Sequence, residues 1–155
     1  MRKYVAQVKN GENPWNAVIP TAVSQEEIAA TEISPERLAP LTECPALLAV
    51  IVDLGVVASM DKDLNRVGVI SGASIYPLAW NIILMARNEG YGGAITTFIA
   101  PEEAKAKKIL EIPDNYAICA LIPIGKPVKQ LTKLSRKPVQ EIASRETFTG
   151  DAFQL

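Results

Sequence analysis

The sequence predicts one domain of mixed helix and strand, of the α/β or α+β class. Three observations support this prediction. Two continuous apolar runs of strand length, residues 46–54 and 116–124, are rich in β-branched side chains. Between them, apolar residues recur at helical spacing over residues 75–86. Strand-like and helix-like segments alternate, without an internal repeat or a change in composition that would mark a second domain. We therefore expect a single domain over residues 1–155.

The N-terminal 45 residues are predicted to be irregular. Asn-Gly and Asn-Pro pairs and five prolines interrupt this part of the chain. Short helices are expected at Arg2–Lys9 and Ser24–Ala30. Trp15, in the sequence ENPWN, lies in a loop and is expected to be a packing anchor rather than a platform for a ligand.

The run that follows Pro45 is predicted to be a central strand that is buried on both faces, because it is apolar throughout. It ends at Asp53–Gly55, and the polar turn DKDLNR comes next. Asp61 and Asp63 in this turn are expected to be solvated rather than to bind a metal, since no further ligands follow them.

A long amphipathic helix is predicted next. Ser71 or Ser74 can cap its start, and Gly90 stands where a left-handed residue ends a helix. Trp80 and its neighbours widen the apolar surface, so this helix is expected to be covered on more than one side, and a partner subunit is one way to cover it. The predicted core stripe consists of Ile75, Leu78, Ala79, Ile82, Ile83 and Ala86.

The C-terminal half is predicted to contain a strand at Gly92–Ile99, a helix over residues 101–110 and a strand at Tyr116–Ile124. The helix has acidic residues in its first turn and lysines later, which suits the helix dipole. Beyond Gly125 the chain becomes polar and basic. Taken alone, this basic segment is typical of a solvated surface rather than of a phosphate site.

Composition excludes several classes of function. The net charge is −1, so no overall attraction to nucleic acid or to an anionic membrane is expected. No apolar run reaches the length of a membrane span, and no signal peptide opens the chain, so a cytoplasmic protein is expected. Cys44 and Cys119 lie in apolar runs and are expected to be reduced.

The chain contains no histidine. This excludes Ser-His-Asp and Cys-His catalysis and the commonest zinc sites. If the protein is an enzyme, a cofactor is expected to carry the chemistry. The glycine cluster GYGG lacks the spacing of a dinucleotide-binding or phosphate-binding loop, so it favours a helix end followed by a turn.

The order of the motifs in the C-terminal half resembles the nitroreductase family, the FMN-dependent NAD(P)H oxidoreductases. The family typically shows a helix ending in ARxxGLG, an apolar strand, an EEV..LLGIP helix, a VALIPLGYP strand and RKPLEEV. Here ARNEGYG, EIPDNYAICALIPIGKP and RKPVQEI stand at those places. The resemblance is best over residues 71–142 and weak over residues 1–45.

The resemblance implies an α+β homodimer with a mixed sheet flanked by helices, and FMN bound at the subunit interface. The strand after the glycine turn would lie along the flavin ring, which assigns Ile95, Thr96 and Thr97, with Phe98 as a further candidate. Arg136 would lie at the flavin phosphate, with Lys137 or Lys133 beside it, because an arginine fork suits phosphate oxygens.

The implied activity is a ping-pong reaction. NAD(P)H gives a hydride to the flavin and leaves, and a small-molecule acceptor such as a nitroaromatic, quinone or activated alkene is then reduced. No catalytic side chain is expected, because the flavin carries the chemistry. The same scaffold would also suit a dehydrogenase or dehalogenase that uses flavin or deazaflavin.

Two N-terminal family motifs, RRSxRxF and PSxxNxQPW, are not found in the sequence MRKYVAQVKNGENPW. In the family these motifs hold the FMN phosphate and touch the flavin ring. The sequence is therefore expected to be N-terminally truncated relative to the family. A non-catalytic module that keeps the dimer-forming helix is the alternative function.

Overall fold

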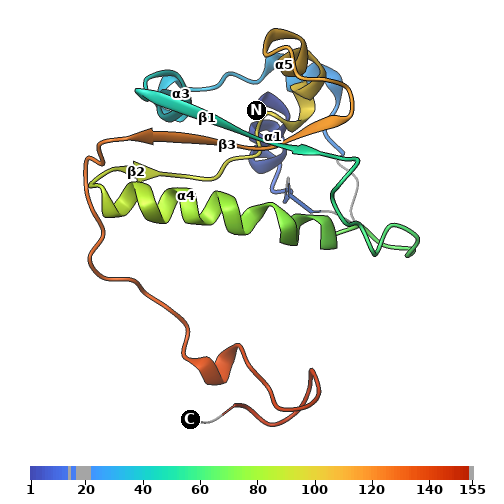
Figure 1. The fold of residues 1–155 in the computed structure, drawn as a ribbon. Coiled ribbons are helices and arrows are strands. Elements are labelled where there is room, and N and C mark those ends of the chain that lie inside the picture. Colours follow the sequence, from blue (N-terminus) through green and yellow to red (C-terminus); the bar gives the residue numbers. More distant parts are fainter. Residues whose placement is uncertain (14, 17–21, 154–155) are drawn as a thin grey trace.

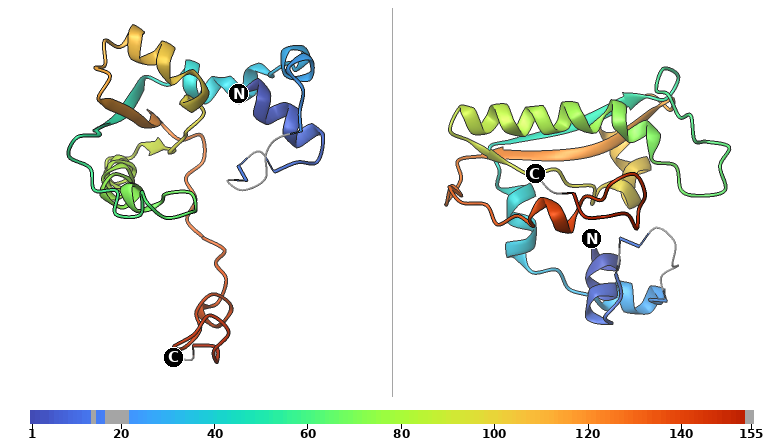
Figure 2. Two further views of the ribbon diagram at one scale, coloured as in Figure 1. Left: turned by 90° about the vertical axis from the view of Figure 1, so that its right-hand side faces the viewer. Right: turned by 90° about the horizontal axis from the view of Figure 1, so that it is seen from below.

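A computed structural model describes residues 1–13, 15–16 and 22–153 of the chain. A small sheet with α4 along its strands forms the body, and α1 and α2 lie together to one side of it (Figures 1 and 2). The elements in chain order are α1 (Arg2–Lys9), α2 (Gln25–Ala30), α3 (Pro35–Thr42), β1 (Ala46–Asp53), the 3-10 turn η1 (Ile70–Ser74), α4 (Tyr76–Asn88), β2 (Gly92–Gly93), η2 (Ala100–Glu102), α5 (Glu103–Ile109), β3 (Tyr116–Gly125) and η3 (Val139–Glu141).

The sheet has three strands in the order β1-β3-β2, and both pairings are antiparallel. The α+β content is as predicted, but the expected mixed sheet is wrong. The two long strands are placed correctly by their apolar runs. They pair directly with each other from Ala46 opposite Ile124 to Asp53 opposite Tyr116, with an irregularity between Val50 and Ile51.

The prediction that β1 is a central strand buried on both faces is wrong. β1 lies at the edge of the sheet, and only Val50 in it is buried. Leu47 and Ile51 remain 45% and 44% exposed. A continuous apolar run does not distinguish a central strand from an edge strand whose outer face lacks a covering layer within the described residues.

The predicted strand Gly92–Ile99 is much shorter, although the chain follows β3 in one register as far as Thr96. Gly92 pairs with Gly125, Gly93 with Ile124, and Thr96 forms an isolated bridge with Leu121. This register places Ala94 opposite Pro123. Proline has no N–H to donate to the ladder, so the pairing is interrupted there.

Helix α4 packs against β3 and β2 and forms the core with them. Ala79, Ala120 and Ile122 are fully buried, and Val50 of β1 completes the cluster. A Cβ atom on Gly93 would lie 3.1 Å from Ile83 Cγ2, so a glycine allows the close approach of α4 to β2. Among the described residues, no helix is long and apolar enough to cross a lipid bilayer.

The C-terminal end of α4 confirms the prediction for Gly90. Gly90 has φ +81° and donates its N–H to Arg87, while the Tyr91 N–H donates to Ala86, which is the Schellman arrangement. At the other end, Ile75 rather than Ser71 or Ser74 precedes the first helical residue, and no side-chain cap forms. The helix instead continues directly from the η1 turn.

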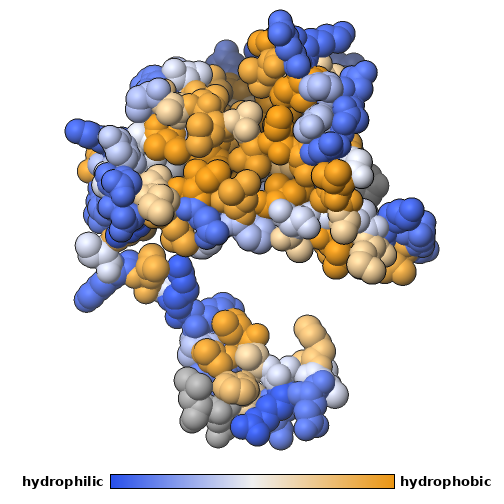
Figure 3. All heavy atoms as spheres, viewed as in Figure 1, coloured by the Kyte–Doolittle hydropathy of each residue, from blue (hydrophilic) through white to orange (hydrophobic). Residues whose placement is uncertain are grey.

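The outer face of α4 carries apolar side chains without a covering layer in the described chain. Leu78, predicted to face the core, is 59% exposed, and Trp80 is 56% exposed. Leu84 and Met85 are also exposed. Figure 3 shows that apolar residues cover a broad part of the body on the side that Figure 1 presents.

The predicted N-terminal helices are confirmed as α1 and α2. Ser24 caps α2 in a capping box with Glu27, since each side chain accepts the other residue's main-chain N–H. Helix α3 was not predicted. Pro35 occupies one of its first two positions and Pro40 lies inside it, so its prolines had indicated irregular chain.

The segment after Gly125 leaves the body and extends beyond α4 (Figures 1 and 2). Arg87 near the end of α4 donates a hydrogen bond of 2.9 Å to the Leu131 carbonyl. Beyond this contact the segment folds back on itself, with Ser144 bridging Ala152. Its predicted polar, irregular character is confirmed apart from the short turn η3.

The turn after β1 corrects the prediction for Asp61, which is only 3% exposed. Its carboxylate accepts hydrogen bonds from the Arg66 guanidinium at 2.7 Å, the Val69 N–H at 2.8 Å and the Ile70 N–H at 3.3 Å. Asp63 is exposed, as expected. One buried aspartate therefore holds the loop over residues 61–70 closed.

We expect Asp61→Asn to open this loop. The Val69 hydrogen bond is the main influence that lowers the Asp61 pKa, and Arg66 acts in the same direction, whereas burial raises it. Because the folded-state pKa lies below the unfolded value, the carboxylate stabilises the loop fully above about pH 4, and this contribution is lost as the pH falls through the folded-state pKa. Faster tryptic cleavage after Arg66 is the measurement, and Asp63→Asn, in the same turn, is the matched control that leaves it unchanged.

Candidate functional site

A cavity of about 360 Å³ lies beside the segment that follows β2, and we call it the edge cavity. One wall is residues 94–98, the segment predicted to follow a flavin ring. Helix α3 and the N-terminal loop form the opposite side, and Pro123 of β3 completes the lining. Its size falls in the range of small-molecule sites. The residues from α3 and the N-terminal loop are Arg37, Pro40, Leu41 and Trp15.

The main chain of residues 95–97 leaves polar groups unpaired at this cavity. Thr96 exchanges two hydrogen bonds with Leu121, of 2.9 and 2.8 Å, so its main-chain groups face β3. Successive residues of an extended chain direct these groups to opposite sides. Accordingly, the N–H and the carbonyl of Ile95 have no hydrogen-bond partner among the described residues, and the same is true of the Thr97 N–H. These groups are available to a ligand that lies along the edge.

Aromatic side chains join the two sides of the edge cavity. Tyr4 of α1 stacks on Trp15 with ring centroids 6.4 Å apart and an interplanar angle of 9°. The other neighbour of Tyr4 is Phe98, at 5.7 Å. Trp15 packs against Tyr4, but it is 63% exposed and lines the cavity. Sequence reasoning missed this second role because Trp15 and Phe98 are far apart in the chain.

Arg37 is the charged residue in the lining of the edge cavity. Its guanidinium makes no hydrogen bond or ion pair with a described residue. An arginine fork binds planar anionic groups such as phosphate and carboxylate. Arg37 was not predicted as a site residue, because helix α3, which carries it, was not predicted. The cavity thus combines aromatic and apolar walls, unpaired main-chain groups and one free cation.

The structure does not place the predicted phosphate residues at this cavity. Arg136 and Lys137 lie on the segment that extends away from the body (Figure 1). Both are exposed. Arg136 donates to the carbonyl of the adjacent Ser135, and Lys137 lies 3.8 Å from Glu141. Ile95, Thr96 and Thr97 are brought together at the edge cavity, and the two basic residues are not among its lining residues.

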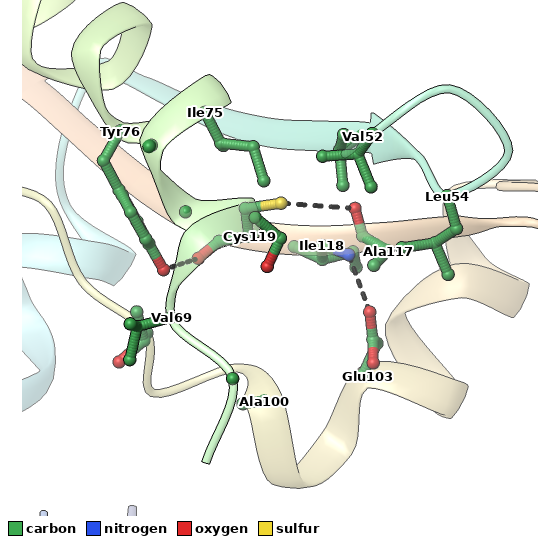
Figure 4. Close-up of a pocket in the computed structure, with 16 residues that line it drawn as sticks. Val52, Leu54, Val69, Ile75, Tyr76, Ala100, Glu103, Ala117, Ile118 and Cys119 are labelled. Carbon is green, nitrogen blue, oxygen red and sulfur yellow. Dashed lines mark hydrogen bonds between the residues drawn. The ribbon is translucent and has the colours of Figure 1, made fainter. Parts of the chain in front are cut away.

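A larger cavity of about 600 Å³ opens at the other side of Thr97, and we call it the Glu103 cavity (Figure 4). The ends of β1 and β3, the loop closed by Asp61, the η1 turn and the start of α5 surround it. Its walls are mainly apolar. Glu103 reaches from α5 to β3, where its Oε1 accepts the Ile118 N–H (Figure 4).

Further polar side chains that line the Glu103 cavity are Ser71, Tyr76, Thr97 and Cys119. Tyr76 donates its hydroxyl to the Cys119 carbonyl at 3.4 Å. The Cys119 thiol lies 3.8 Å from the Ala117 carbonyl. Burial raises the pKa of the Cys119 thiol, and the negative charge of Glu103 adds to this effect. Cys119 is thus a poor nucleophile. Cys44 and Cys119 are both free, as predicted, and both are partly buried.

Comparison with known proteins finds a protein family whose sequence pattern matches most of the chain. A family profile described as "Nitroreductase family" matches residues 12–126, a range that includes Trp15, Arg37 and Ile95–Thr97 and ends before Arg136. No curated protein matches the chain.

Two solved structures with TM-scores above 0.5 support the same fold. The NfrA1 nitroreductase from B. subtilis aligns over 95% of this chain and 53% of its own, with a TM-score of 0.55 and 15% identity. A Bacteroides fragilis NCTC 9343 protein named as an oxidoreductase aligns over 73% and 52%, with a TM-score of 0.53 and 16% identity. A BluB-like flavoprotein from Clostridium difficile 630 is 26% identical over 48% of this chain and 36% of its own, with a TM-score of 0.42. The chain spans about half the length of the first two proteins.

Proposed function

The chain belongs to the nitroreductase family, and from this premise we propose that it binds FMN in the edge cavity and acts as a flavin-dependent oxidoreductase. The proposed reaction transfers a hydride from NAD(P)H to a small-molecule acceptor of the nitroaromatic, quinone or activated-alkene class. The observation that carries the proposal is the row of unpaired main-chain groups at Ile95 and Thr97, beside a cavity of ligand size.

The residues at the edge cavity fit the parts of FMN. The flavin ring system is planar and has hydrogen-bonding atoms along one side, which suits the free main-chain groups of Ile95 and Thr97. Thr96 would position this segment through its two bonds to Leu121. Trp15 and Phe98 provide apolar surface for a planar ring.

A phosphate needs a cation, and two are proposed. Arg37 is supported by its place in the lining of the edge cavity and by its unpaired guanidinium. Arg136, with Lys137 beside it, is supported by the RKP motif of the sequence and lies outside the cavity in this structure. We favour Arg37, and titration of the two alanine variants, described in the Discussion, decides between them.

FMN supplies, when bound, the two-electron chemistry between NAD(P)H and the acceptor. The chain's own residues would hold the ring against residues 95–97, keep one side of it covered by Trp15 and Phe98, and balance the negative charge of the phosphate. No described side chain is required as an acid or base in this proposal.

A titration of the purified chain with FMN tests the proposal. We expect saturable quenching of flavin fluorescence and flavin absorbance bands that persist through desalting, because the edge cavity offers stacking surface, hydrogen bonds and a cation together. NAD(P)H oxidation with a quinone or nitroaromatic acceptor should then depend on added FMN. Protein that stays colourless and leaves flavin fluorescence unchanged would contradict FMN binding.

The exposed face of α4 supports a second candidate function, a homodimerisation module without catalysis. Leu78, Trp80, Leu84 and Met85 are exposed apolar side chains on this helix, and exposed apolar surface can mark an interaction site. Under either candidate function, we propose that α4 packs against α4 of a second copy. Light scattering on the samples of the FMN titration separates the candidates: a dimer that binds no flavin favours the module, and a monomer contradicts the assembly.

A further inference from the structure

We propose that the Glu103 cavity is a second binding site, and that it takes a small organic cation with an apolar, aromatic body and a protonated amine. This site is separate from the edge cavity and its occupation does not require flavin. The size of the cavity, its mainly apolar lining and the single charged residue in that lining favour such a ligand.

The cavity has the dimensions and the walls of a site for an aromatic molecule. Its volume of about 600 Å³ is in the middle of the range for small-molecule pockets. The apolar walls include Val52 of β1, Leu54 just after β1, Ile75 before α4 and Ile118 of β3. Burial of an aromatic ring against such walls supplies most of the binding energy. The polar groups of the cavity then determine which functional group the ligand can carry.

Glu103 sets the charge of the site. It is the charged residue in the lining, and no lysine or arginine of the described chain lines the cavity with it. Its Oε1 accepts the Ile118 N–H, whereas Oε2 has no hydrogen-bond partner among the described residues. A carboxylate offers about four acceptor positions, so most of this capacity remains for a ligand. An ammonium group is therefore favoured here and a ligand carboxylate or phosphate is repelled.

The polar groups of the cavity are held in place before a ligand arrives. The hydrogen bond to Ile118 fixes the Glu103 carboxylate against β3 (Figure 4). On the other side, Asp61 fixes Val69, which lines the cavity, through the Val69 N–H. The carboxylate of Asp61 is itself paired with Arg66 and does not line the cavity. A prearranged site loses less conformational freedom on binding.

The two cavities meet at Thr97 and have opposite charge. Thr97 lines both, with Arg37 in the edge cavity and Glu103 in the larger one. A phosphate-bearing ligand is accordingly directed to the edge cavity and a cationic ligand to the Glu103 cavity. This contrast can be tested, because ligands that share one ring system but differ in charge should bind the Glu103 cavity with different affinities.

The test is calorimetric titration of the full chain at neutral pH with naphthylmethylamine, naphthalenemethanol and naphthaleneacetate, which share a ring and differ in charge. We expect the amine to bind one site per chain at least about tenfold more tightly than the acetate. Glu103→Gln should weaken the amine about tenfold, the loss expected for a charge-assisted contact, and change the neutral alcohol less than twofold. Gln retains an oxygen that can accept the Ile118 N–H.

Two more variants complete the test. Glu102→Gln is the matched control, because Glu102 is exposed and pairs with Lys105 rather than lining the cavity. It should leave the affinity for the amine unchanged. Ala73→Phe, which places a large side chain in the lining, should remove binding of all three compounds. The proposal would be overturned if the amine and the acetate bound with equal affinity, or if the amine showed no saturable binding. It would also be overturned if Ala73→Phe bound the amine as tightly as the wild type.

Discussion

Replacing Arg37 with alanine is expected to weaken FMN binding by roughly ten- to a hundredfold, which corresponds to a charge-assisted contact of about 1.5–3 kcal/mol. Arg37 is the cation in the lining of the edge cavity and its guanidinium has no described partner. The alanine therefore removes the proposed phosphate contact without breaking an existing ion pair. Flavin fluorescence titration of the wild type and the variant measures the change.

Arg136→Ala is the matched variant, because it removes the same charge from the extended C-terminal segment. We expect a change of less than twofold. A tenfold loss with Arg136→Ala and none with Arg37→Ala would move the phosphate contact to the C-terminal segment. Arg37→Lys should recover only part of the affinity, since an ammonium keeps the charge but loses the planar fork.

Ile122→Ala is expected to lower the free energy of unfolding by about 3 kcal/mol, within the range of 2–5 kcal/mol for such truncations. Ile122 is the largest fully buried side chain, and it lies in a core cluster with Val50, Ala79 and Ala120. Because domains are stable by only about 5–15 kcal/mol, one such change is a large fraction of the total.

Urea unfolding followed by circular dichroism measures this effect. Ile109→Ala is the control, because Ile109 on α5 is 80% exposed and should change stability by less than about 0.5 kcal/mol. If Ile122→Ala does not fold, Ile122→Val provides a milder truncation with an expected loss of about 1 kcal/mol. Equal stability of the Ile122 and Ile109 variants would show that the core lies elsewhere.

The sequence was most informative where one local rule determined the structure. The limits of β1 and β3 followed from apolar runs bounded by turn residues, and the end of α4 followed from Gly90, whose positive φ suits glycine. Residues 95–97, predicted to lie along a flavin ring, line the edge cavity in the structure. Their assignment to a flavin came from the resemblance and awaits the titration.

Features that depend on residues distant in sequence could not be predicted. The loss of the ladder after Gly93 requires Pro123 to lie opposite Ala94, which only the register reveals. The burial of Asp61 depends on main-chain donors eight and nine residues later. Arg37 was missed because the prolines of α3 resemble loop punctuation, although they are compatible with a short helix.

The free edge of β1 has a consequence for handling the protein. Its outer edge has no paired strand in the described chain, and Leu47, Leu48 and Ile51 are exposed along it without a charged residue before Asp53. An apolar edge strand without a lysine or proline within it is a template for strands of other molecules. Concentrated samples should therefore aggregate through this strand. Ala49→Lys should reduce this aggregation, because a charge on the edge strand disfavours pairing with a second chain.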